Sequence, residues 1–242
     1  MLQRSDLLAR IRSNIDKFGY HITVVTGGAL PRFAYTIGCT TTLSAEFIFA
    51  GGEFYSQSQV SEILAATIAV ASTEADWPTR TIRTDSLGCF SLVKVHPSWA
   101  ELLALGAFDY YNQPTLSVWQ VVPDFVHHTV DVPVMVEAFD EATQPVWQWL
   151  TRQWEYPIPA DSMAVTNLLV LAGAKATEVM RWEEDDWEIF AGTGPDIPKA
   201  DMRIVPFGTL LGIDASLKVA IDLKVGKGVW RDPLALDWQP WG

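Results

Sequence analysis

Apolar residues recur at helical spacing near the N-terminus of this chain. Leu7, Ile11 and Ile15 form one stripe, and Gly19 follows it, which predicts an amphipathic helix over residues 5–18. A helix with one apolar stripe buries that stripe against a neighbouring layer. We therefore expect this helix to pack on a sheet formed by the segments that follow.

Three segments after this helix are rich in apolar and β-branched residues and are separated by glycines or turn residues. They read YHITVVTGG, RFAYTIGCT and EFIFAGG, at residues 20–28, 32–40 and 46–52. The pair Gly27-Gly28 between the first two suits a tight turn, so these two segments are predicted to form an antiparallel hairpin. The third segment is predicted to be another strand.

The pattern then alternates between helices and strands. A helix is predicted over residues 56–71, a strand over 88–96, a helix from Pro97 to Tyr111 and a strand over 116–125. The face of the first of these helices that we expect to be buried consists of Val60, Ile63, Leu64, Thr67, Ile68 and Ala71. Antiparallel strands with helices packed on one face form a domain of the α+β class.

The periodicity is lost around residues 151–160, where TRQWEYPIPA contains two prolines at alternate positions. We interpret this segment as a linker between a domain at residues 1–150 and a smaller α+β domain at residues 161–242. In the second domain, residues 167–175, 176–182 and 187–192 are predicted to be strands, and a short helix is expected after Pro206. The fold class is thus two small α+β domains with mostly antiparallel sheets.

Charge narrows the kind of partner that we expect. The chain of 242 residues has a formal net charge of −12. Residues 1–150 hold 8 Lys and Arg against 15 Asp and Glu (net −7), and residues 151–242 hold 9 against 14 (net −5). Such a field repels nucleic acid and anionic lipid and attracts basic proteins, although acidic surfaces also serve solubility alone. We expect neither nucleic-acid nor membrane binding.

No cofactor or metal signature appears in the sequence. The histidines lack the spacing of a metal site, and the glycine pairs match no phosphate-binding loop. A nucleophilic pair of Cys39 or Cys89 with a histidine has no local signature. The chain begins without the long apolar core of a signal peptide and has no apolar run of 18 residues, so we predict a cytoplasmic protein with free thiols.

One alternative is an enzyme or small-ligand-binding protein whose groove is formed by Tyr35, Thr36, Cys39, Gln120 and Asp124. Adjacent strand residues point to opposite faces, so Tyr35 and Thr36 cannot both face the same side of the sheet. The simpler interpretation is that their hydroxyls hydrogen-bond neighbouring strands.

A second candidate site is a partner-binding surface in the C-terminal part. Eight of the 11 tryptophans occur at or after Trp147, and Trp and Tyr often anchor interfaces. The predicted partner-binding residues are Glu183, Glu184, Asp185, Asp186, Trp238 and Trp241. Trp182 and Trp187 are expected in the core. A merely solvated acidic turn and homodimerisation through the tryptophan-rich end are the alternatives.

The N-terminal part resembles the domain-of-unknown-function family DUF4262. The resemblance is carried by FAYTIG (Phe33–Gly38) after a helix and a GYHITVV strand, and by WQVVPD (Trp119–Asp124). The chain departs from the family pattern at Ala45, where proline is usual, and at Cys39, where leucine is usual. QPVW, at residues 144–147, resembles the closing segment of the family.

Residues 162–238 are similar to another family, DUF2185, which is assigned to immunity proteins of polymorphic toxin systems. The matching elements are DDWEIFAG (Asp185–Gly192), VPFGTLL, and a turn with Asp214, Ser216 and Leu217, followed by a terminal Trp238. This resemblance implies a bacterial binding protein that neutralises a cognate toxin by contact and catalyses no reaction. The net charge of −12 favours a basic toxin as that partner.

Overall fold

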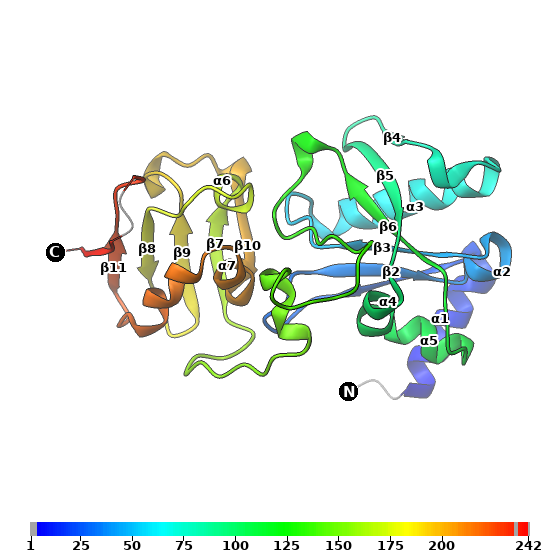
Figure 1. Cartoon of the computed structure of the whole chain (residues 1–242), viewed down its shortest axis with the longest axis horizontal. Helices are drawn as coiled ribbons and strands as arrows, with labels where there is room; N and C mark the ends of the chain where they lie inside the picture. Colours follow the sequence, from blue (N-terminus) through cyan, green and yellow to red (C-terminus); the bar gives the residue numbers. More distant parts are fainter. Residues whose placement is uncertain (1–3, 235–236, 242) are drawn as a thin grey trace. The chain divides into compact units, whose positions relative to one another are not determined.

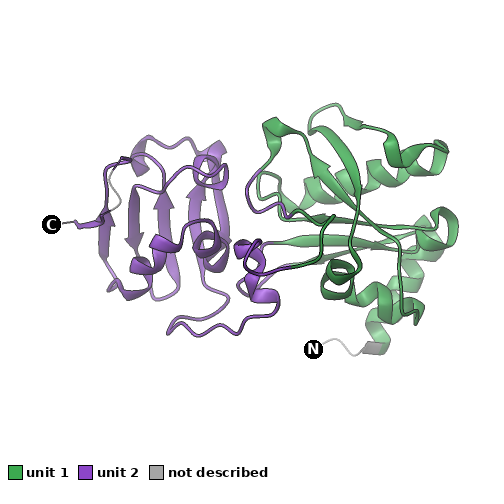
Figure 2. Cartoon of the chain, in the orientation of Figure 1, with its two compact units in different colours: residues 1–25, 32–128, 134–139 green, residues 26–31, 129–133, 140–242 purple. Residues whose placement is uncertain are grey.

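The computed structural model describes residues 4–234 and 237–241, and the chain forms two compact units (Figure 2). Unit 1 comprises residues 1–25, 32–128 and 134–139, and unit 2 comprises residues 26–31, 129–133 and 140–242. The change from one unit to the other near residue 140 therefore comes before the predicted linker. Among the described helices, none is long and apolar enough to cross a membrane.

Unit 1 is built on a six-stranded sheet with the order β1-β2-β3-β6-β5-β4. Its strands are β1 (His21–Val25), β2 (Phe33–Ile37), β3 (Glu46–Ala50), β4 (Ile82–Thr84), β5 (Gly88–Lys94) and β6 (Val118–Pro123). All neighbours are antiparallel except β3 and β6. The predicted hairpin of β1 and β2 is confirmed, with Thr23 opposite Tyr35.

The helices of unit 1 are α1 (Arg4–Phe18), α2 (Thr40–Leu43), α3 (Gln57–Thr73), α4 (Pro97–Leu103) and α5 (Leu105–Tyr111). The six residues predicted for the buried face of α3 are all buried. Ser56 begins α3 with a capping box, because its hydroxyl accepts from Gln59 N while the Gln59 side chain accepts from Ser56 N. The predicted single helix over 97–111 is divided at Ala104 into α4 and α5.

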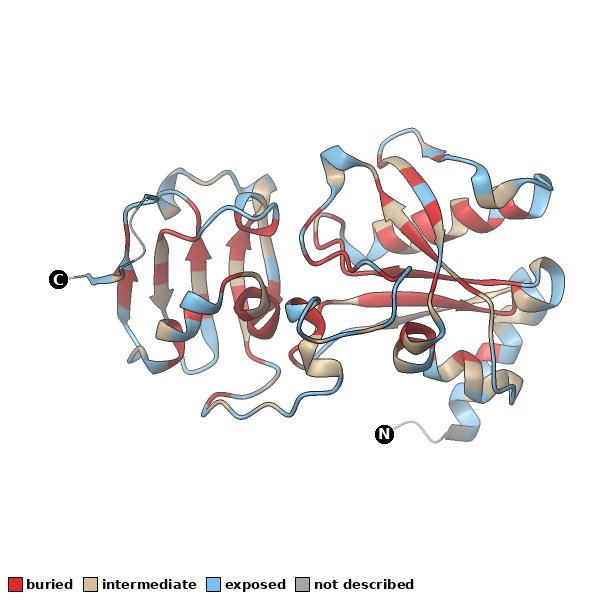
Figure 3. Ribbon diagram, viewed as in Figure 1, coloured by how far each residue is buried: buried red, intermediate tan, exposed pale blue. Residues whose placement is uncertain are grey.

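The central strands of unit 1 are covered on both faces. Every residue of β2 and β3 is buried (Figure 3). On one face, Ala34, Phe47 and Phe49 pack against α3. On the other face, the Tyr35 hydroxyl accepts a hydrogen bond of 3.1 Å from Gly106 N of α5. Figure 1 shows α3 and α4 on opposite sides of β2 and β3.

Unit 2 is also built on a six-stranded sheet, with the order β10-β7-β9-β8-β11-β12. Its strands are β7 (Met163–Asn167), β8 (Glu178–Arg181), β9 (Asp186–Phe190), β10 (Met202–Pro206), β11 (Lys227–Trp230) and β12 (Gln239–Pro240). Only the β7–β9 pair is parallel among the described strands of this sheet. The predicted hairpin around residues 183–186 is confirmed by the antiparallel pairing of β8 with β9.

Two helices cover one face of this sheet, α7 (Phe207–Ile213) and the 3-10 helix η6 (Ala215–Asp222). The prediction of a strand over residues 167–175 was wrong, because Leu168–Leu171 form the single turn α6. The Asn167 side chain accepts from Val170 N at the start of this turn. A short apolar run fits a buried helical turn as well as a strand, so its sequence alone does not distinguish them.

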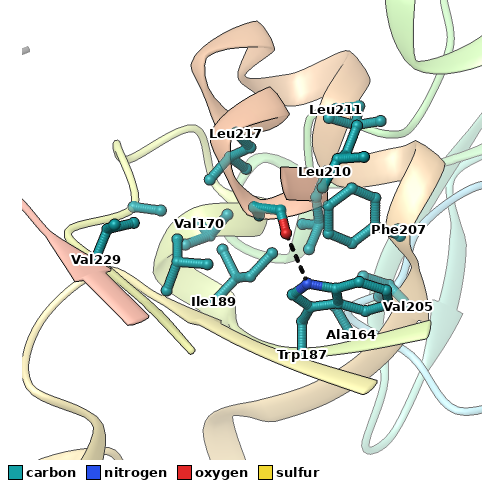
Figure 4. Packing of buried hydrophobic residues seen from close by; sticks show 14 of the residues in the cluster. Ala164, Val170, Trp187, Ile189, Val205, Phe207, Leu210, Leu211, Leu217 and Val229 are labelled. Carbon is teal, nitrogen blue, oxygen red and sulfur yellow. Dashed lines mark hydrogen bonds between the residues drawn. The ribbon is translucent and has the colours of Figure 1, made fainter. Parts of the chain in front are cut away.

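Trp187 lies at the centre of the unit 2 core. Its side chain is fully buried, and its ring packs against Phe207 with centroids 4.9 Å apart (Figure 4). The indole Nε1–H donates to the Ala220 carbonyl oxygen at 3.0 Å, which satisfies the one polar atom of the side chain. Trp182 was expected in the core as well, but its side chain is 48% exposed. Side chains at odd-numbered positions of the β8–β9 hairpin, such as Trp187, face the core, and those at even-numbered positions, such as Trp182, face the other way.

The segment predicted to be a linker packs on this core. Ile158 is buried in it, and Trp154 and Tyr156 lie against it. The Trp154 Nε1–H donates to the Ile158 carbonyl oxygen at 2.7 Å, and its ring meets those of Trp149 and Tyr156 edge to face. Residues 151–160 are therefore part of unit 2, since their aromatic side chains bury apolar surface there.

Two tryptophan-to-alanine substitutions test this account of the core. Trp187→Ala removes a buried ring and leaves a cavity, so we expect a loss of about 3–5 kcal/mol in the free energy of unfolding of unit 2. Trp182→Ala changes a largely exposed side chain and should shift it by less than about 0.5 kcal/mol. Urea denaturation followed by circular dichroism measures both. Equal losses in the two variants would contradict the account.

Candidate functional site

The residues predicted to line a ligand groove do not converge in one cavity. Tyr35, Thr36, Cys39 and Gln120 are buried, with exposed fractions of 5% or less. Cys39 lines a cavity of about 520 Å³ together with residues of α1, α2 and α3, and none of the other four predicted residues lines it. Asp124 lies at the end of β6 and caps a 3-10 turn.

The buried carboxylate of Glu46 organises the region around the FAYTIG segment. Its Oε2 accepts a hydrogen bond of 2.5 Å from the Thr36 hydroxyl. Its Oε1 accepts from the backbone N–H and the hydroxyl of Thr40, both at 2.9 Å, and from the Tyr111 hydroxyl at 2.5 Å. Glu46 is fully buried, and a buried charge of this kind is stable only when it is hydrogen-bonded.

The backbone fixes the direction of two of these hydroxyl donors. Thr36 Oγ1 accepts from Phe47 N at 2.8 Å, and the Tyr111 hydroxyl oxygen accepts from Gly38 N at 2.6 Å. Each hydroxyl hydrogen is therefore free to point at Glu46. Gly38 has φ +116°, and a Cβ there would lie 3.0 Å from both Gly19 O and the Ile15 side chain, which explains the glycine at the end of FAYTIG.

The structure thus gives Thr36 and Tyr35 structural hydrogen bonds. Glu46 and Tyr111 are the important residues of this network that the sequence reasoning missed. A signal for Glu46 was present in the sequence, because a glutamate at the head of the apolar run EFIFA has to find donors when that strand is buried. Tyr111 is 65 positions away in sequence and had no such signal.

Cys39 is not placed as a nucleophile. Burial, followed by the nearby Glu46 charge, raises the pKa of its thiol to about 12. At pH 8 roughly one thiol in ten thousand would be ionised, and only the thiolate reacts. Cys39 behaves instead as a small apolar side chain of the α3 core.

Asp124 belongs to a separate polar cluster with His127 and Cys89. His127 Nδ1 lies 2.6 Å from Asp124 Oδ1, and Cys89 N donates to Asp124 Oδ2 at 2.8 Å. Burial opposes ionisation of Asp124, but these hydrogen bonds outweigh it and hold the pKa of the carboxyl below its ordinary value. In the described part of the chain, no group of three or more His, Cys, Asp or Glu side chains is placed to hold a metal ion.

A groove in unit 2 lies on the face of its sheet opposite Val179, Trp187 and Ile189. It has a volume of about 580 Å³. Its lining comes from β8, β9, β10, the loop after β9 and the C-terminal segment, and consists of Glu178, Met180, Trp182, Glu188, Phe190, Thr193, Gly194, Pro195, Met202 and Trp241. We call this set of residues the unit 2 groove. Its wall is aromatic and aliphatic, with two carboxylates and no basic side chain.

The two carboxylates of the unit 2 groove differ in their partners. Glu178 Oε2 accepts from Gly194 N at 2.9 Å. The Glu188 side chain has no hydrogen-bonding or ionic partner among the residues that the structure describes, although it lies half-buried between Met180 on one neighbouring strand and Val165 on the other. A carboxylate in this position has unused capacity to accept hydrogen bonds.

The predicted partner-binding residues are divided between this groove and its surroundings. Trp241 lines the groove and is 39% exposed. Glu183, Glu184, Asp185 and Asp186 are exposed at the β8–β9 turn, which lies next to Trp182 in the chain. Trp238 was expected to be exposed, but it is half-buried because its ring lies over the Arg231 guanidinium, 4.1 Å away.

Gly228 allows Trp241 to lie on the sheet. Trp241 N donates to Gly228 O at 3.0 Å, and a Cβ on Gly228 would collide with the indole ring of Trp241 and with Val179 O. The glycine in the middle of β11 therefore marks a close approach of another part of the chain. The sequence reasoning did not identify Met180, Phe190 or Glu188 as site residues, since it could not place them on one face without the strand register.

Comparison with known proteins bears on unit 1. Residues 14–128 match the family described as a domain of unknown function, DUF4262. The N-terminal resemblance is confirmed over these residues, and the resemblance of QPVW at residues 144–147 stays a prediction. The DUF4262 segment contains the whole Glu46 network. No curated protein and no solved structure matches the chain. The similarity of residues 162–238 to DUF2185 stays a prediction.

Substitutions in the Glu46 network test its structural role. Glu46→Gln replaces an acceptor by an NH₂ group that faces donors, so we expect a loss of about 3 kcal/mol in the free energy of unfolding of unit 1. Tyr111→Phe removes one donor and should cost about 1–2 kcal/mol. Glu62→Gln, at an exposed position of α3, is the matched control, with a change below about 0.5 kcal/mol. If Glu46→Gln matches this control, the network contributes no stability.

Thiol reactivity tests the assignment of Cys39. We expect iodoacetamide at pH 8 to modify Cys39 in the folded chain far more slowly than the partly exposed Cys89, because the Cys39 thiol is buried and protonated. Both should react at similar rates in urea. Peptide mass spectrometry over a time course distinguishes the two sites, and faster labelling of Cys39 in the folded chain would overturn the assignment.

Proposed function

We propose that this chain is an acidic binding protein of immunity type, which neutralises a basic toxin by protein–protein contact. The unit 2 groove is the observation that supports this most directly, because an apolar and aromatic cavity with an unpartnered carboxylate suits a positively charged partner. The exposed turn at residues 183–186, which follows Trp182 in the chain, adds four more acidic side chains. The similarity to DUF2185 suggested the same class of function.

Electrostatics and aromatic contact would contribute differently to such a complex. The net charge of −12 would raise the rate at which a basic protein is encountered, and this effect weakens with salt. Buried contact with Trp182 and Trp241 would then hold the partner, because aromatic side chains carry much of the binding energy of interfaces. We place this activity in the cytoplasm of a bacterial cell, where a toxin would act.

The alternative of an enzyme or small-ligand site near Tyr35, Cys39, Gln120 and Asp124 has less support. The Tyr35 hydroxyl is engaged by the α5 backbone, and Cys39 has a raised thiol pKa. Asp124 is held in the cluster with His127 and Cys89. These arrangements suit structural roles better than a shared reaction.

A growth assay tests the proposal. Each protein encoded beside this chain is expressed with and without it in a bacterial host, and we expect one such protein, with a basic surface, to arrest growth unless the chain is present. The variant E183Q/E184Q/D185N/D186N should lower protection at least ten-fold, measured as surviving colonies, because four charges near the groove are lost.

The matched control for that variant removes the same number of charges from exposed positions of unit 1. It carries D16N, E62Q, D85N and E101Q and has the same net charge. Protection by this control should equal that of the wild-type chain. The proposal fails if no neighbouring protein is toxic, or if the two four-fold variants lose protection equally.

A further inference from the structure

We infer that the unit 2 groove binds the side chain of an arginine presented by a segment of a partner protein. This inference rests on the proposed function for the source of the arginine, and it assigns the chemistry that the groove recognises. It is carried by three observations: the aromatic wall, the unpartnered Glu188, and the way unit 2 binds its own arginines.

The aromatic wall suits a planar cation. Trp182, Phe190 and Trp241 line one groove, and Met180 and Met202 supply polarisable apolar surface between them. A guanidinium stacks on the face of an indole ring with favourable cation–π energy, and its aliphatic stem packs on apolar side chains. The two methionines can adjust to that stem, because their unbranched side chains adopt many shapes.

The carboxylates supply the complementary charge. Glu188 lacks a partner among the described residues. Glu178 Oε2 accepts from Gly194 N, and no described residue donates to its other oxygen, Oε1. An arginine can donate two parallel hydrogen bonds to a carboxylate, which a lysine ammonium cannot do. No lysine or arginine lines the groove, so nothing in its wall would repel the incoming cation or attract an anion.

Unit 2 holds one of its own arginines with these two kinds of group. Arg231 lies 4.1 Å from the centre of the Trp238 ring, and its Nη2 donates to Asp214 Oδ2 at 2.7 Å. Arg181 also lies near an aromatic ring, 4.8 Å from the centre of the Trp187 ring, but it donates to backbone carbonyl oxygens. The unit 2 groove offers the pair of features that holds Arg231, an indole and a carboxylate, and no basic side chain lines it.

A purely apolar occupant fits the groove less well. It would bury Glu188 without any compensating hydrogen bond, and burial of an unpaired carboxylate is strongly unfavourable. An anionic occupant would meet two carboxylates directly. The charge of the groove therefore selects a cation, and the shape of its aromatic wall selects a planar one.

The test uses the full chain and two short peptides. The probe is acetyl-Gly-Leu-Arg-Leu-Gly-amide, and its control is the same peptide with citrulline, which keeps the shape of arginine and removes its charge. Nuclear magnetic resonance follows the indole N–H signals of Trp182 and Trp241 during the titration. We expect the arginine peptide to bind at least five-fold more tightly than the citrulline peptide and to shift both indole signals.

Two variants locate the interaction. Glu188→Gln should abolish most of the difference between the peptides, because it removes the unpartnered charge and keeps the size of the side chain. Glu155→Gln removes an equal charge from an exposed position of unit 2 outside the groove and should retain the difference. Thermal unfolding of each variant verifies that unit 2 is folded. If Glu188→Gln does not fold, Trp241→Ala provides a second test, because it alters only a partly exposed ring.

The outcomes separate this inference from the proposed function. Equal affinity for the two peptides, failure of the arginine peptide to shift either indole signal, or unchanged discrimination in the variants would overturn the inference. In a further titration with acetyl-Gly-Leu-Lys-Leu-Gly-amide, tighter binding of this lysine peptide than of the arginine peptide would also overturn the inference. If the peptides are discriminated as expected but no toxin is neutralised in the growth assay, the arginine site stands and the immunity function falls.

Discussion

The hydrogen bonds around the buried carboxylate of Glu46 are the interaction on which unit 1 depends. A charge without exposure to water is tolerable only when donors replace the water, and here they come from β2, from the start of α2 and from the end of α5. Gly38 completes this set, because its backbone N–H donates to the Tyr111 hydroxyl oxygen and so directs the hydroxyl hydrogen toward Glu46. The hydroxyls of Thr36 and Tyr35 in the FAYTIG segment are therefore both engaged in hydrogen bonds within the fold.

Unit 2 presents a carboxylate in the opposite situation. Glu188 is half-buried beside apolar side chains, and no described residue satisfies it. Arg231 and Asp214, by contrast, form an ion pair in which both side chains are almost completely buried, with further hydrogen bonds to Ala176 O and Ser216. Within one unit, therefore, the fold satisfies the buried Asp214 and leaves the half-buried Glu188 without a partner among the described residues. Buried polar groups with all their hydrogen bonds made inside the unit help to define its fold. A half-buried carboxylate without such partners can still accept hydrogen bonds from a bound molecule.

The sequence predicted the parts of this structure that depend on local pattern. The buried face of α3, the β1–β2 hairpin and the β8–β9 turn all follow from periodicity and turn residues. The strand predicted at residues 167–175 failed because a four-residue apolar run fits two structures. The strands β7 and β10 were not predicted. The candidate site was harder, since Glu188, Phe190 and Trp241 share a face only through strand register and through the close approach that Gly228 allows. The acidic turn and Trp241 could be proposed from composition, but their neighbours could not.

The central claim is that unit 2 binds a basic partner through the face that carries its groove, while the polar network of unit 1 serves folding. Hydrogen exchange measured by mass spectrometry, on the chain alone and saturated with the toxic protein identified by the growth assay, tests this claim most directly. The account predicts slower exchange in β8, in β9 and in residues 239–241 of the complex, with the backbone around Glu46 unchanged. Protection confined to the DUF4262 segment, with unit 2 unaffected, would contradict it.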